Sequence, residues 1–581
     1  MKSRSLGAIV IPSGDPHKSE YVAEHWKMRI WIAGFTGSAG TVIITHDHVG
    51  LWTDARYFLQ AEEELKESGG ALHKLTLQGG SDHVEWLAKE LPEGSTVGID
   101  GYLFSSAEVN SMEKILNEKN ISLNVNADPF PEIWNDRPSL PKESIFEISA
   151  DIVGRDRSHR IADLESTLNA KGAKGMLLTA LDEIAWLLNL RGKDVECNPV
   201  FIAYAVWDGT HMFLFTDPDK INDELKGILQ GSDIFIEPYE SINTFLQNLP
   251  TDLPILVDAG KTSHALCELL KSHKIIWGDS PITMQKAVKN ATEQQHIRHV
   301  MVKDGVALLR AYRWLEETLT HREVSEAEFA SQIAHSRSMM PGYFGESFNA
   351  IIGYQSNGAI IHYKPEEATS AMIRPDGMLL VDSGGQYLDG TTDTTRTHHL
   401  STPTAEQKLH YTLVLQGHIS LAMAVFPEGT KGIQLDLLAR QHLWQRQLNF
   451  GHGTGHGVGF FMNVHEPPQG FVASLNERGT TAHEPGMLSS NEPGFYVNGS
   501  YGIRIENLVL CQPAGESTFG KFNKFETVTL FPIDTNLIQV DLMSPAEKKW
   551  LNDYHVKVMQ FLGPHLEMQE REWLEKKCQP I

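Results

Sequence analysis

The sequence Gly-His-Gly-Thr-Gly-His-Gly-Val-Gly at residues 451–459 decides how the C-terminal half is built. Glycine at every second position makes a helix implausible, because each interior glycine costs about 1 kcal/mol relative to alanine. In an extended chain His452 and His456 share one face, and the glycines allow close backbone approach. A glycine-rich loop with surface histidines is the alternative. We therefore predict an extended segment that presents two imidazoles together.

Carboxylates and one further histidine recur in other segments of the same half. The strand-like run Met378–Asp382 ends in an acid, and Asp393 follows within a threonine-rich stretch. His465 lies in Asn-Val-His-Glu, and Glu492 precedes a proline. Taken singly, the acids are more typical of turns, caps and exposed edges than of ligands.

The run Gly502–Asn507 alternates apolar and charged side chains, as a strand does. Its two isoleucines would face a core, while Arg504 and Glu506 would share the other face. This pattern predicts a metal ligand at Glu506 with a positive charge, Arg504, beside it. An exposed strand face with an ordinary ion pair is the alternative.

Charge balance is the physical reason to join these segments into one site. Four buried carboxylates repel one another unless cations compensate them. Two divalent cations match their charge, and one neutral imidazole completes the set. Oxygen-rich coordination with a single nitrogen favours a hard metal such as Mn²⁺ over a thiolate-type zinc site. The predicted ligands are Asp382, Asp393, His456, Glu492 and Glu506.

The two aspartates also predict a strand register. Asp389-Gly390 is a strong signal for a two-residue hairpin loop, which would place Asp382 opposite Thr397. Asp393 would then lie about 13 Å away along the strand, at about 3.3 Å per residue, too far for a shared metal. We therefore expect this hairpin signal to fail and a wider turn centred near Tyr387-Leu388 to form.

Roughly the first 280 residues read as two copies of one α/β pattern. Val97–Asp100 corresponds to Ile255–Asp258, and Leu51–Asp54 corresponds to Leu214–Asp217. Each segment is an apolar strand that ends in aspartate. Convergent strand–turn–helix patterning is the alternative to a duplication.

Breaks in the pattern mark the ends of the copies. A polar stretch at Pro138–Arg160 separates them, and a second break lies at Asp279–Met284. Within the first copy we expect a helix over Tyr57–Glu67 and a strand over Leu75–Leu77. The region after the second break reads as α+β, and the tail from Ser544 to Glu575 turns helical.

Composition narrows the function classes. The 581 residues include 50 basic and 74 acidic side chains, a formal charge of −24 that argues against a general nucleic-acid binder. No apolar run approaches the roughly 18 residues needed to span a bilayer, and the start lacks a signal-peptide core. Four scattered cysteines make neither a disulfide framework nor a thiolate metal site. We therefore expect a cytoplasmic protein without nucleic-acid or membrane partners.

With these motifs in place, the sequence resembles the pita-bread metallopeptidases, a family that includes methionine aminopeptidase, prolidase and Xaa-Pro aminopeptidase. Its three-domain aminopeptidase P type is the most similar. The resemblance runs end to end and rests on strings in a fixed order. They are Leu51–Phe58, Ala359–Tyr363, Asp389–Thr397, Gly451–His456, Asn491–Tyr496, Phe525–Leu530 and Trp550–Tyr554.

The resemblance implies a combined α/β and α+β fold. Two creatinase-like α/β domains would occupy residues 1–155 and 156–283. A pita-bread catalytic domain with a helical extension would occupy residues 284–581, and the chain would form a homodimer through this last domain.

The resemblance also implies residue roles around two divalent ions, with Mn²⁺ as the expected metal. Asp382 would bind one ion, and His456 would bind the other. Asp393 and Glu506 would bridge them, and Glu492 would be a ligand beside the bridging water.

Further residues match the substrate-contacting positions of the family. Three histidines are assigned to substrate contact and catalysis: His362, His452 and His465. Arg56 would contact the substrate, and a structural ion pair with Asp54 is the alternative reading of its position.

The implied reaction is hydrolysis of the bond between an N-terminal residue and a penultimate proline. This bond resists ordinary aminopeptidases, because proline lacks a backbone N–H and has a fixed φ. Glu492 would accept the proton of the attacking water, and His465 or His362 would stabilise the oxyanion. The free amine of the substrate would meet Asp382 or its metal.

Two other functions share parts of the pattern. An Xaa-Pro dipeptidase would use the same metal set but accept only dipeptides, and the duplicated first half and Arg56 favour longer peptides. A pita-bread module that only binds partners would keep the fold without catalysis, but five intact ligand positions argue against it.

Overall fold

The structure of the protein is a computed structural model that describes residues 1–66, 68–75 and 81–581. It divides into two compact units, one of Met1–Ala150 with Arg155–Ile282 and one of Asp151–Gly154 with Thr283–Ile581. The predicted helix end at Glu67 and most of the predicted strand Leu75–Leu77 lie outside the described residues. The boundary between residues 155 and 156 stays a prediction, because both predicted N-terminal domains belong to the first unit.

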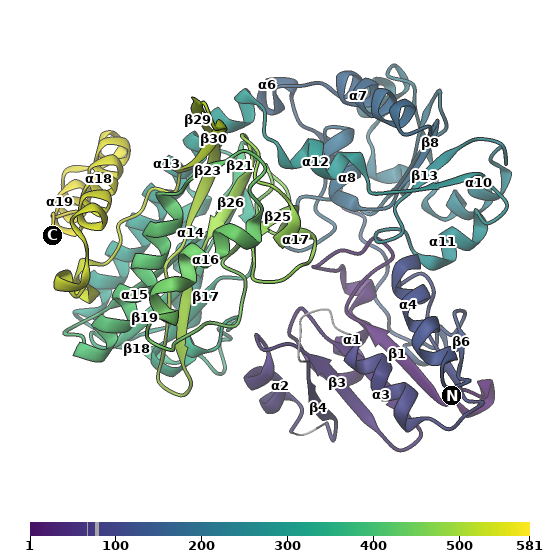
Figure 1. The fold of residues 1–581 in the computed structure, drawn as a ribbon, viewed down its shortest axis with the longest axis horizontal. Coiled ribbons are helices and arrows are strands. Elements are labelled where there is room, and N and C mark those ends of the chain that lie inside the picture. The colour runs from purple at the N-terminus through teal and green to yellow at the C-terminus, as the bar shows by residue number, and fades with distance from the viewer. Residues whose placement is uncertain (67, 76–80) are drawn as a thin grey trace. The chain divides into compact units, whose positions relative to one another are not determined.

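The first unit holds two six-stranded sheets with the same topology (Figure 1). Their strand orders are β4-β3-β2-β1-β5-β6 and β12-β11-β10-β8-β13-β14, with parallel and antiparallel pairs at the same positions in both. The strands of the first sheet are β1 Ala8–Pro12, β2 Thr41–Thr45, β3 Val49–Thr53, β4 Ala71–Lys74, β5 Thr96–Gly98 and β6 Ser122–Asn124. Those of the second are β8 Gly175–Leu178, β10 Tyr204–Trp207, β11 Met212–Phe215, β12 Ile234–Glu237, β13 Ile255–Val257 and β14 Ile275–Trp277.

This common topology agrees with the predicted repeat. The matched segments fall on equivalent strands, β5 with β13 and β3 with β11. The copies also meet through equivalent residues at the starts of helices α4 (Ser106–Asn117) and α11 (His264–Leu269). The Ser106 N–H donates to the Thr262 carbonyl at 3.0 Å, and the His264 N–H donates to the Phe104 carbonyl at 2.8 Å. Such reciprocal bonds are what a local two-fold relation between the copies produces.

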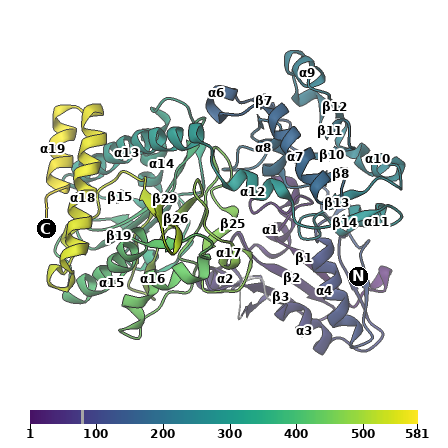
Figure 2. The same ribbon diagram turned by 45° about the horizontal axis from the view of Figure 1, so that its top comes forward.

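The second unit is the α+β region expected from the sequence. Figure 2 shows its strands lying between two pairs of helices, α13 (Ala291–Leu319) with α14 (Glu326–Ser338) and α15 (Ala405–Ala422) with α16 (Gly432–Trp444). Two helices of the C-terminal tail, α18 (Pro545–Leu562) and α19 (Met568–Lys577), pack against α13, and α18 also packs against α15.

The strands of the second unit form several small sheets and one larger sheet, β23-β30-β29-β26-β24-β25. Three of the small sheets are β17-β19-β22, β16-β20-β21 and β27-β28. The bounds are β16 Tyr343–Glu346, β17 Ile351–Tyr354, β19 Met378–Ser383, β20 Gly385–Tyr387, β21 Gly390–Thr391, β22 Thr394–His399, β23 Val425–Pro427, β24 Gly455–Gly457, β25 Glu466–Phe471, β26 Leu488–Asn491, β27 Gly494–Val497, β28 Tyr501–Arg504, β29 Asn507–Ser517 and β30 Gly520–Thr527. All predicted metal ligands lie on or between these strands.

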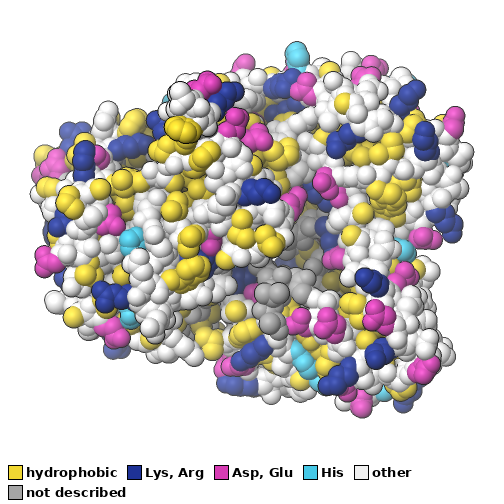
Figure 3. Space-filling view, in the orientation of Figure 1, with side chains coloured by type: hydrophobic (Ala, Val, Ile, Leu, Met, Phe, Trp, Pro, Cys, Tyr) yellow, Lys and Arg dark blue, Asp and Glu magenta, His cyan; other side chains and the backbone are white. Residues whose placement is uncertain are grey.

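The surface and the helices add two observations on partners. Acidic and basic side chains are interspersed on the face in Figure 3. Among the described residues, every helix is too short or too polar to cross a bilayer.

Candidate metal centre

The register of β19 and β22 brings the two aspartates to one face. Asp382 pairs with Thr395, and not with Thr397, so the Asp389-Gly390 hairpin signal fails as predicted. The expected wider turn centred near Tyr387-Leu388 is wrong. Tyr387 pairs with Gly390, so the loop has only two residues, Leu388 and Asp389. This register is shared by β19–β22 and β20–β21, and it places Asp393 opposite Gly384. That position is two residues along the strand from the Asp382 pair, and therefore on the same face.

Gly384 permits this approach, because it has no side chain. A Cβ atom at this position would lie 2.0 Å from the Thr392 carbonyl oxygen and 2.2 Å from the Ser347 hydroxyl. The β ladder is interrupted here, with β19 ending before Gly384 and β22 beginning after Asp393. Asp393 is therefore held at a break in the ladder, where it is 4% exposed, and is not a solvated edge residue.

A second break positions the two glutamates. Strand β26 pairs with β29 through Asn491 and Asn507, and β27 pairs with β28 through Gly494 and Arg504. The same register runs through both pairs and places Glu492 opposite Glu506. Both glutamates lie between strands, so their side chains leave the ladder together.

His456 on β24 faces these carboxylates. Its Nδ1 lies 2.9 Å from the Gly457 carbonyl, which fixes the Nδ1–H tautomer and leaves Nε2 as an acceptor. This Nε2 lies 3.3 Å from Glu492 Oε1 and 3.5 Å from Asp393 Oδ2. Asp393, His456 and Glu506 each offer one ligand atom, and these three atoms lie within 4.8 Å of one another. The regular strand covers only Gly455–Gly457, so the extended conformation predicted for residues 451–459 is wrong around His452, which lies in a bend.

Mutual repulsion and burial perturb the acids. Burial raises the pKa of Asp393 and Glu506 well above their ordinary values, and neighbouring carboxylates raise both further. Burial also raises the pKa of Glu492 to about 7, with Arg504 acting in the opposite direction and Asp382 adding to the rise. The ionised form of these buried carboxyl groups is therefore unfavourable unless positive charge lies nearby.

Arg504 supplies part of that charge, and both it and Glu506 are buried, at 2% and 1% exposure. The alternative of an exposed ion pair on this strand is therefore wrong. The guanidinium donates to Asp382 Oδ2 at 2.7 Å and to Thr395 Oγ1 at 3.3 Å. Thr395 in turn donates to Glu506 Oε2 at 2.7 Å. The other Asp382 oxygen, Oδ1, is buried with no hydrogen-bond partner among the described residues, as expected of an oxygen reserved for a cation.

The three further histidines differ in their surroundings. His465 packs edge-on against His456, with ring centroids 4.3 Å apart. His452 Nδ1 lies 2.7 Å from the Gly453 carbonyl, so its Nε2 accepts from the Tyr496 hydroxyl at 2.9 Å, and Tyr496 accepts from Arg504 at 2.7 Å. His362 follows Ile361, whose carbonyl lies 3.5 Å from Arg504.

Arg56 lies in the other unit and is not placed relative to this cluster. It makes a two-pronged pair with Asp54, at 2.8 Å for each bond. This is the ion pair that the sequence offered as the alternative to a substrate contact, so a role in substrate binding stays a proposal.

Sequence reasoning missed four polar side chains of the site. Thr395 and Tyr496 are described above, Ser490 donates to Glu492 Oε1 at 3.0 Å, and Arg396 is wholly buried behind Glu506. Thr395 and Arg396 lie inside the threonine-rich string, and Tyr496 closes the Asn491–Tyr496 string. The position of these three residues within the two strings is the sequence feature that could have identified them.

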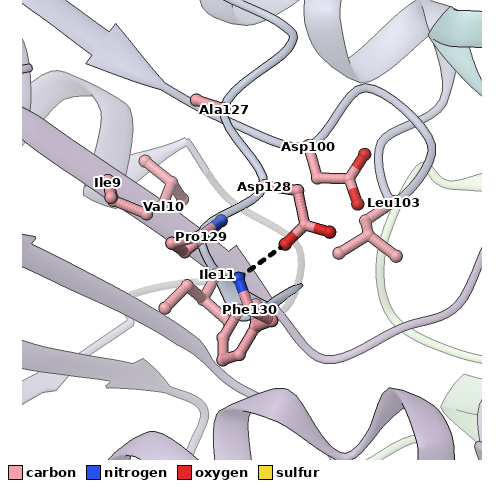
Figure 4. A pocket seen from close by; sticks show the side chains of 9 residues that line it. All are labelled: Ile9, Val10, Ile11, Asp100, Leu103, Ala127, Asp128, Pro129 and Phe130. Atoms are coloured by element: carbon pink, nitrogen blue, oxygen red, sulfur yellow. Dashed lines mark hydrogen bonds between the residues drawn. The ribbon is translucent and has the colours of Figure 1, made fainter. Parts of the chain in front are cut away.

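A small cavity in the first unit is no rival to this centre (Figure 4). It contains Asp100, whose pKa is raised to about 6 by burial, and Asp128, which accepts from the Phe130 N–H at 2.9 Å. Its volume is about 10 Å³, room for about one water molecule and not for a peptide.

Family models match nearly the whole chain. The model described as metallopeptidase family M24 matches residues 295–513, and a model of its C-terminal region matches residues 521–581. Two models of the creatinase/prolidase N-terminal domain match residues 1–128 and 136–293.

Individual relatives agree with these models. A probable Xaa-Pro aminopeptidase P of Laccaria bicolor is 42% identical, over 100% of this chain and 92% of its own length. Xaa-Pro aminopeptidase 1 of Dictyostelium discoideum is 39% identical, over 100% and 95%.

Solved structures extend the comparison to the fold. An X-prolyl aminopeptidase of Caenorhabditis elegans, described as a cytosolic enzyme with a di-nuclear active site, superposes with a TM-score of 0.95 at 33% identity, over 99% of this chain and 95% of that one. An Xaa-Pro dipeptidase of Bacillus anthracis shares the fold, with a TM-score of 0.53 at 21% identity, over 65% of this chain and 99% of its own. Together with the convergence of five ligand-type side chains, these matches show that the chain belongs to the aminopeptidase P group of metallopeptidase family M24.

Proposed function

We propose that the protein is a metal-dependent aminopeptidase that releases an N-terminal residue from peptides with proline in second position. One observation carries this proposal: four carboxylates and one histidine, spread over 125 residues from Asp382 to Glu506, converge, and three of the carboxylates do so from breaks in the β ladders. A chain that is 42% identical end to end to an Xaa-Pro aminopeptidase P relative supports the substrate class.

Two divalent ions fit this donor set. Asp382 would hold one through its unpartnered Oδ1, His456 would hold the other through Nε2, and Asp393 and Glu506 would bridge. Glu492 would complete the set. Oxygen donors with one imidazole favour Mn²⁺. When bound, the ions would lower the pKa of a water molecule so that it can attack a carbonyl at neutral pH.

Glu492 is the proposed general base. Its pKa of about 7 without metal reflects a buried carboxyl group that accepts a proton readily. Ser490 holds Oε1 at 3.0 Å and so limits the rotation of the carboxyl group. Glu492 would take the proton of the attacking water and deliver it to the proline nitrogen, which becomes the leaving amine.

The histidines would bind and polarise the substrate. His465, packed on His456, and His362, beside the Arg504 contact, are the two proposed donors to the developing oxyanion. His452 is held by Tyr496 and would contact the substrate. Arg56 is proposed as a further substrate contact.

The dipeptidase alternative is disfavoured by chain architecture. The Bacillus anthracis dipeptidase aligns over 99% of its length but covers only 65% of this chain, so this chain carries additional structure. We also propose a cytoplasmic location and a homodimer. The Caenorhabditis elegans relative is described as cytosolic, and the dimer rests on the family resemblance alone.

The test combines metal analysis with two substrates. The purified protein, supplemented with Mn²⁺, should release arginine from Arg-Pro-Pro and should cleave Gly-Pro poorly or not at all. Metal analysis should find two ions per chain. Efficient cleavage of Gly-Pro alone would support the dipeptidase instead, and absence of both metal and hydrolysis would support the non-catalytic module.

A further inference from the structure

We infer that Tyr554, on helix α18 of the C-terminal tail, is a positioning residue for the proposed metal-binding carboxylates. Its hydroxyl accepts a hydrogen bond from Arg396, whose guanidinium joins the two chain segments that carry Asp393 and Glu506. This inference rests on the proposed function, because it concerns the same metal centre. It gives the C-terminal extension a role in the chemistry of the site.

Arg396 is buried in an unusual shell of neutral acceptors. It is 1% exposed, and no carboxylate among the described residues pairs with it. The shell consists of the carbonyls of Thr395, Glu506, Phe531 and Pro532, the Asn507 amide oxygen and the Tyr554 hydroxyl. These six acceptors surround five N–H groups, and three of them, Asn507, Phe531 and Tyr554, share the two protons of Nη2. A buried guanidinium without a counter-ion needs all its N–H groups satisfied, because an unsatisfied N–H keeps the full cost of its lost hydration.

Two of these acceptors belong to the ligand segments themselves. Arg396 Nη1 lies 2.9 Å from the Thr395 carbonyl and 2.5 Å from the Glu506 carbonyl. The Glu506 N–H donates to the same Thr395 carbonyl at 3.1 Å. Thr395 is the residue opposite Asp382 and lies two positions after Asp393. The guanidinium therefore fixes the spacing between strands at the point where regular pairing is interrupted.

Tyr554 anchors the far side of the guanidinium. Arg396 Nη2 donates to its hydroxyl at 2.9 Å, and the hydroxyl donates to the Phe531 carbonyl at 2.8 Å. The ring stacks on Trp550 one turn earlier, at 5.4 Å and 3°. A capping box at Ser544, with proline at the first position, fixes the start of the helix. Tyr554 on α18 thus contacts Arg396, and Arg396 contacts the backbone of Glu506, so a shift of α18 would move both.

Tyr554→Phe tests this chain of contacts, because it removes one hydroxyl and keeps the ring. Leu551→Val is the matched control: Leu551 is fully buried on the same helix, and the change loosens packing without removing a hydrogen bond. Both full-length proteins would be freed of metal with a chelator. Mn²⁺ affinity would be measured by titration calorimetry, and the absorption spectrum of the Co²⁺-loaded protein would report the coordination geometry.

Tyr554→Phe should bind Mn²⁺ more weakly and change the Co²⁺ spectrum. The loss of affinity should approach but not exceed the roughly 10–100-fold found when a direct outer partner of a metal ligand is removed, because Tyr554 acts through Arg396. Leu551→Val should keep the affinity and spectrum of the unaltered protein. Unchanged Mn²⁺ affinity in Tyr554→Phe, or an equal loss in both variants, would overturn the inference while leaving the proposed function intact. If the unaltered protein itself bound no Mn²⁺, the proposed function would fall first.

Discussion

The metal-free protein should become less stable as the pH rises through the range where Glu492 titrates. Burial raises the pKa of this carboxyl from 4.5 to about 7. Between these values the unfolded chain has released a proton that the folded chain retains, so the free energy of unfolding falls with increasing pH. At about 1.4 kcal/mol per pH unit, Glu492 alone should lower it by about 3 kcal/mol. Asp393 and Glu506, whose pKa values are also raised, act in the same direction.

Urea unfolding in the presence of a chelator, at about pH 5 and about pH 8, measures this loss. Other buried groups also titrate in this range, so the informative quantity is the difference between the protein and Glu492→Gln, which cannot ionise. The pH-dependent loss should be smaller in the variant by about 3 kcal/mol. Added Mn²⁺ should stabilise the unaltered protein more at the higher pH, because protons and metal compete for the same oxygens. An identical pH dependence in the two proteins would refute the electrostatic account of the site.

Three further predictions follow from single contacts. Glu492→Gln should keep the fold but abolish release of arginine from Arg-Pro-Pro, and appreciable turnover would remove Glu492 as the general base. Gly384→Ala should weaken Mn²⁺ binding in a calorimetric titration, because its Cβ would lie 2.0 Å from the Thr392 carbonyl and push the Asp393 segment away; unchanged binding would contradict the proposed close approach. Glu466→Gln should lower the free energy of unfolding by about 3–5 kcal/mol, because it removes the charge of the buried carboxylate that two buried lysines share. Asp553→Asn, which breaks an exposed pair, should change it by about 1 kcal/mol or less, and equal effects would contradict this difference in burial.

The sequence indicated which acids and histidines cluster better than it indicated their local geometry, and their role as metal ligands stays a proposal. Charge balance alone joined the acids, and the described structure brings Asp393, His456 and Glu506 together. The strand repeats of the first unit were also accessible, because apolar strands that end in aspartate recur in order. These features depend on residue type and order, which a sequence displays directly.

Local rules failed where tertiary contacts override them. The Asp389-Gly390 signal is the usual one for a tight hairpin, yet the loop forms one residue earlier, at Leu388-Asp389. Alternation in Gly502–Asn507 left an exposed face open as the alternative to a metal ligand, and Arg504 and Glu506 are instead almost as buried as Ile503 and Ile505. In both places the partner strand decides the outcome, and no periodicity within the segment contains that information.

The interruptions of the β ladders explain why local sequence rules are least reliable in the segments that form this site. A continuous antiparallel pair directs successive side chains to opposite faces and uses its backbone groups for pairing. Asp393, Glu492 and Glu506 each lie in a gap between two strands, where a side chain can leave the sheet and approach the others. Such gaps are unfavourable unless other groups satisfy the freed backbone, and Arg396 does so by binding the Glu506 and Thr395 carbonyls. The departure from regular pairing and the buried arginine behind it are therefore two parts of one arrangement, which holds like charges together until cations compensate them.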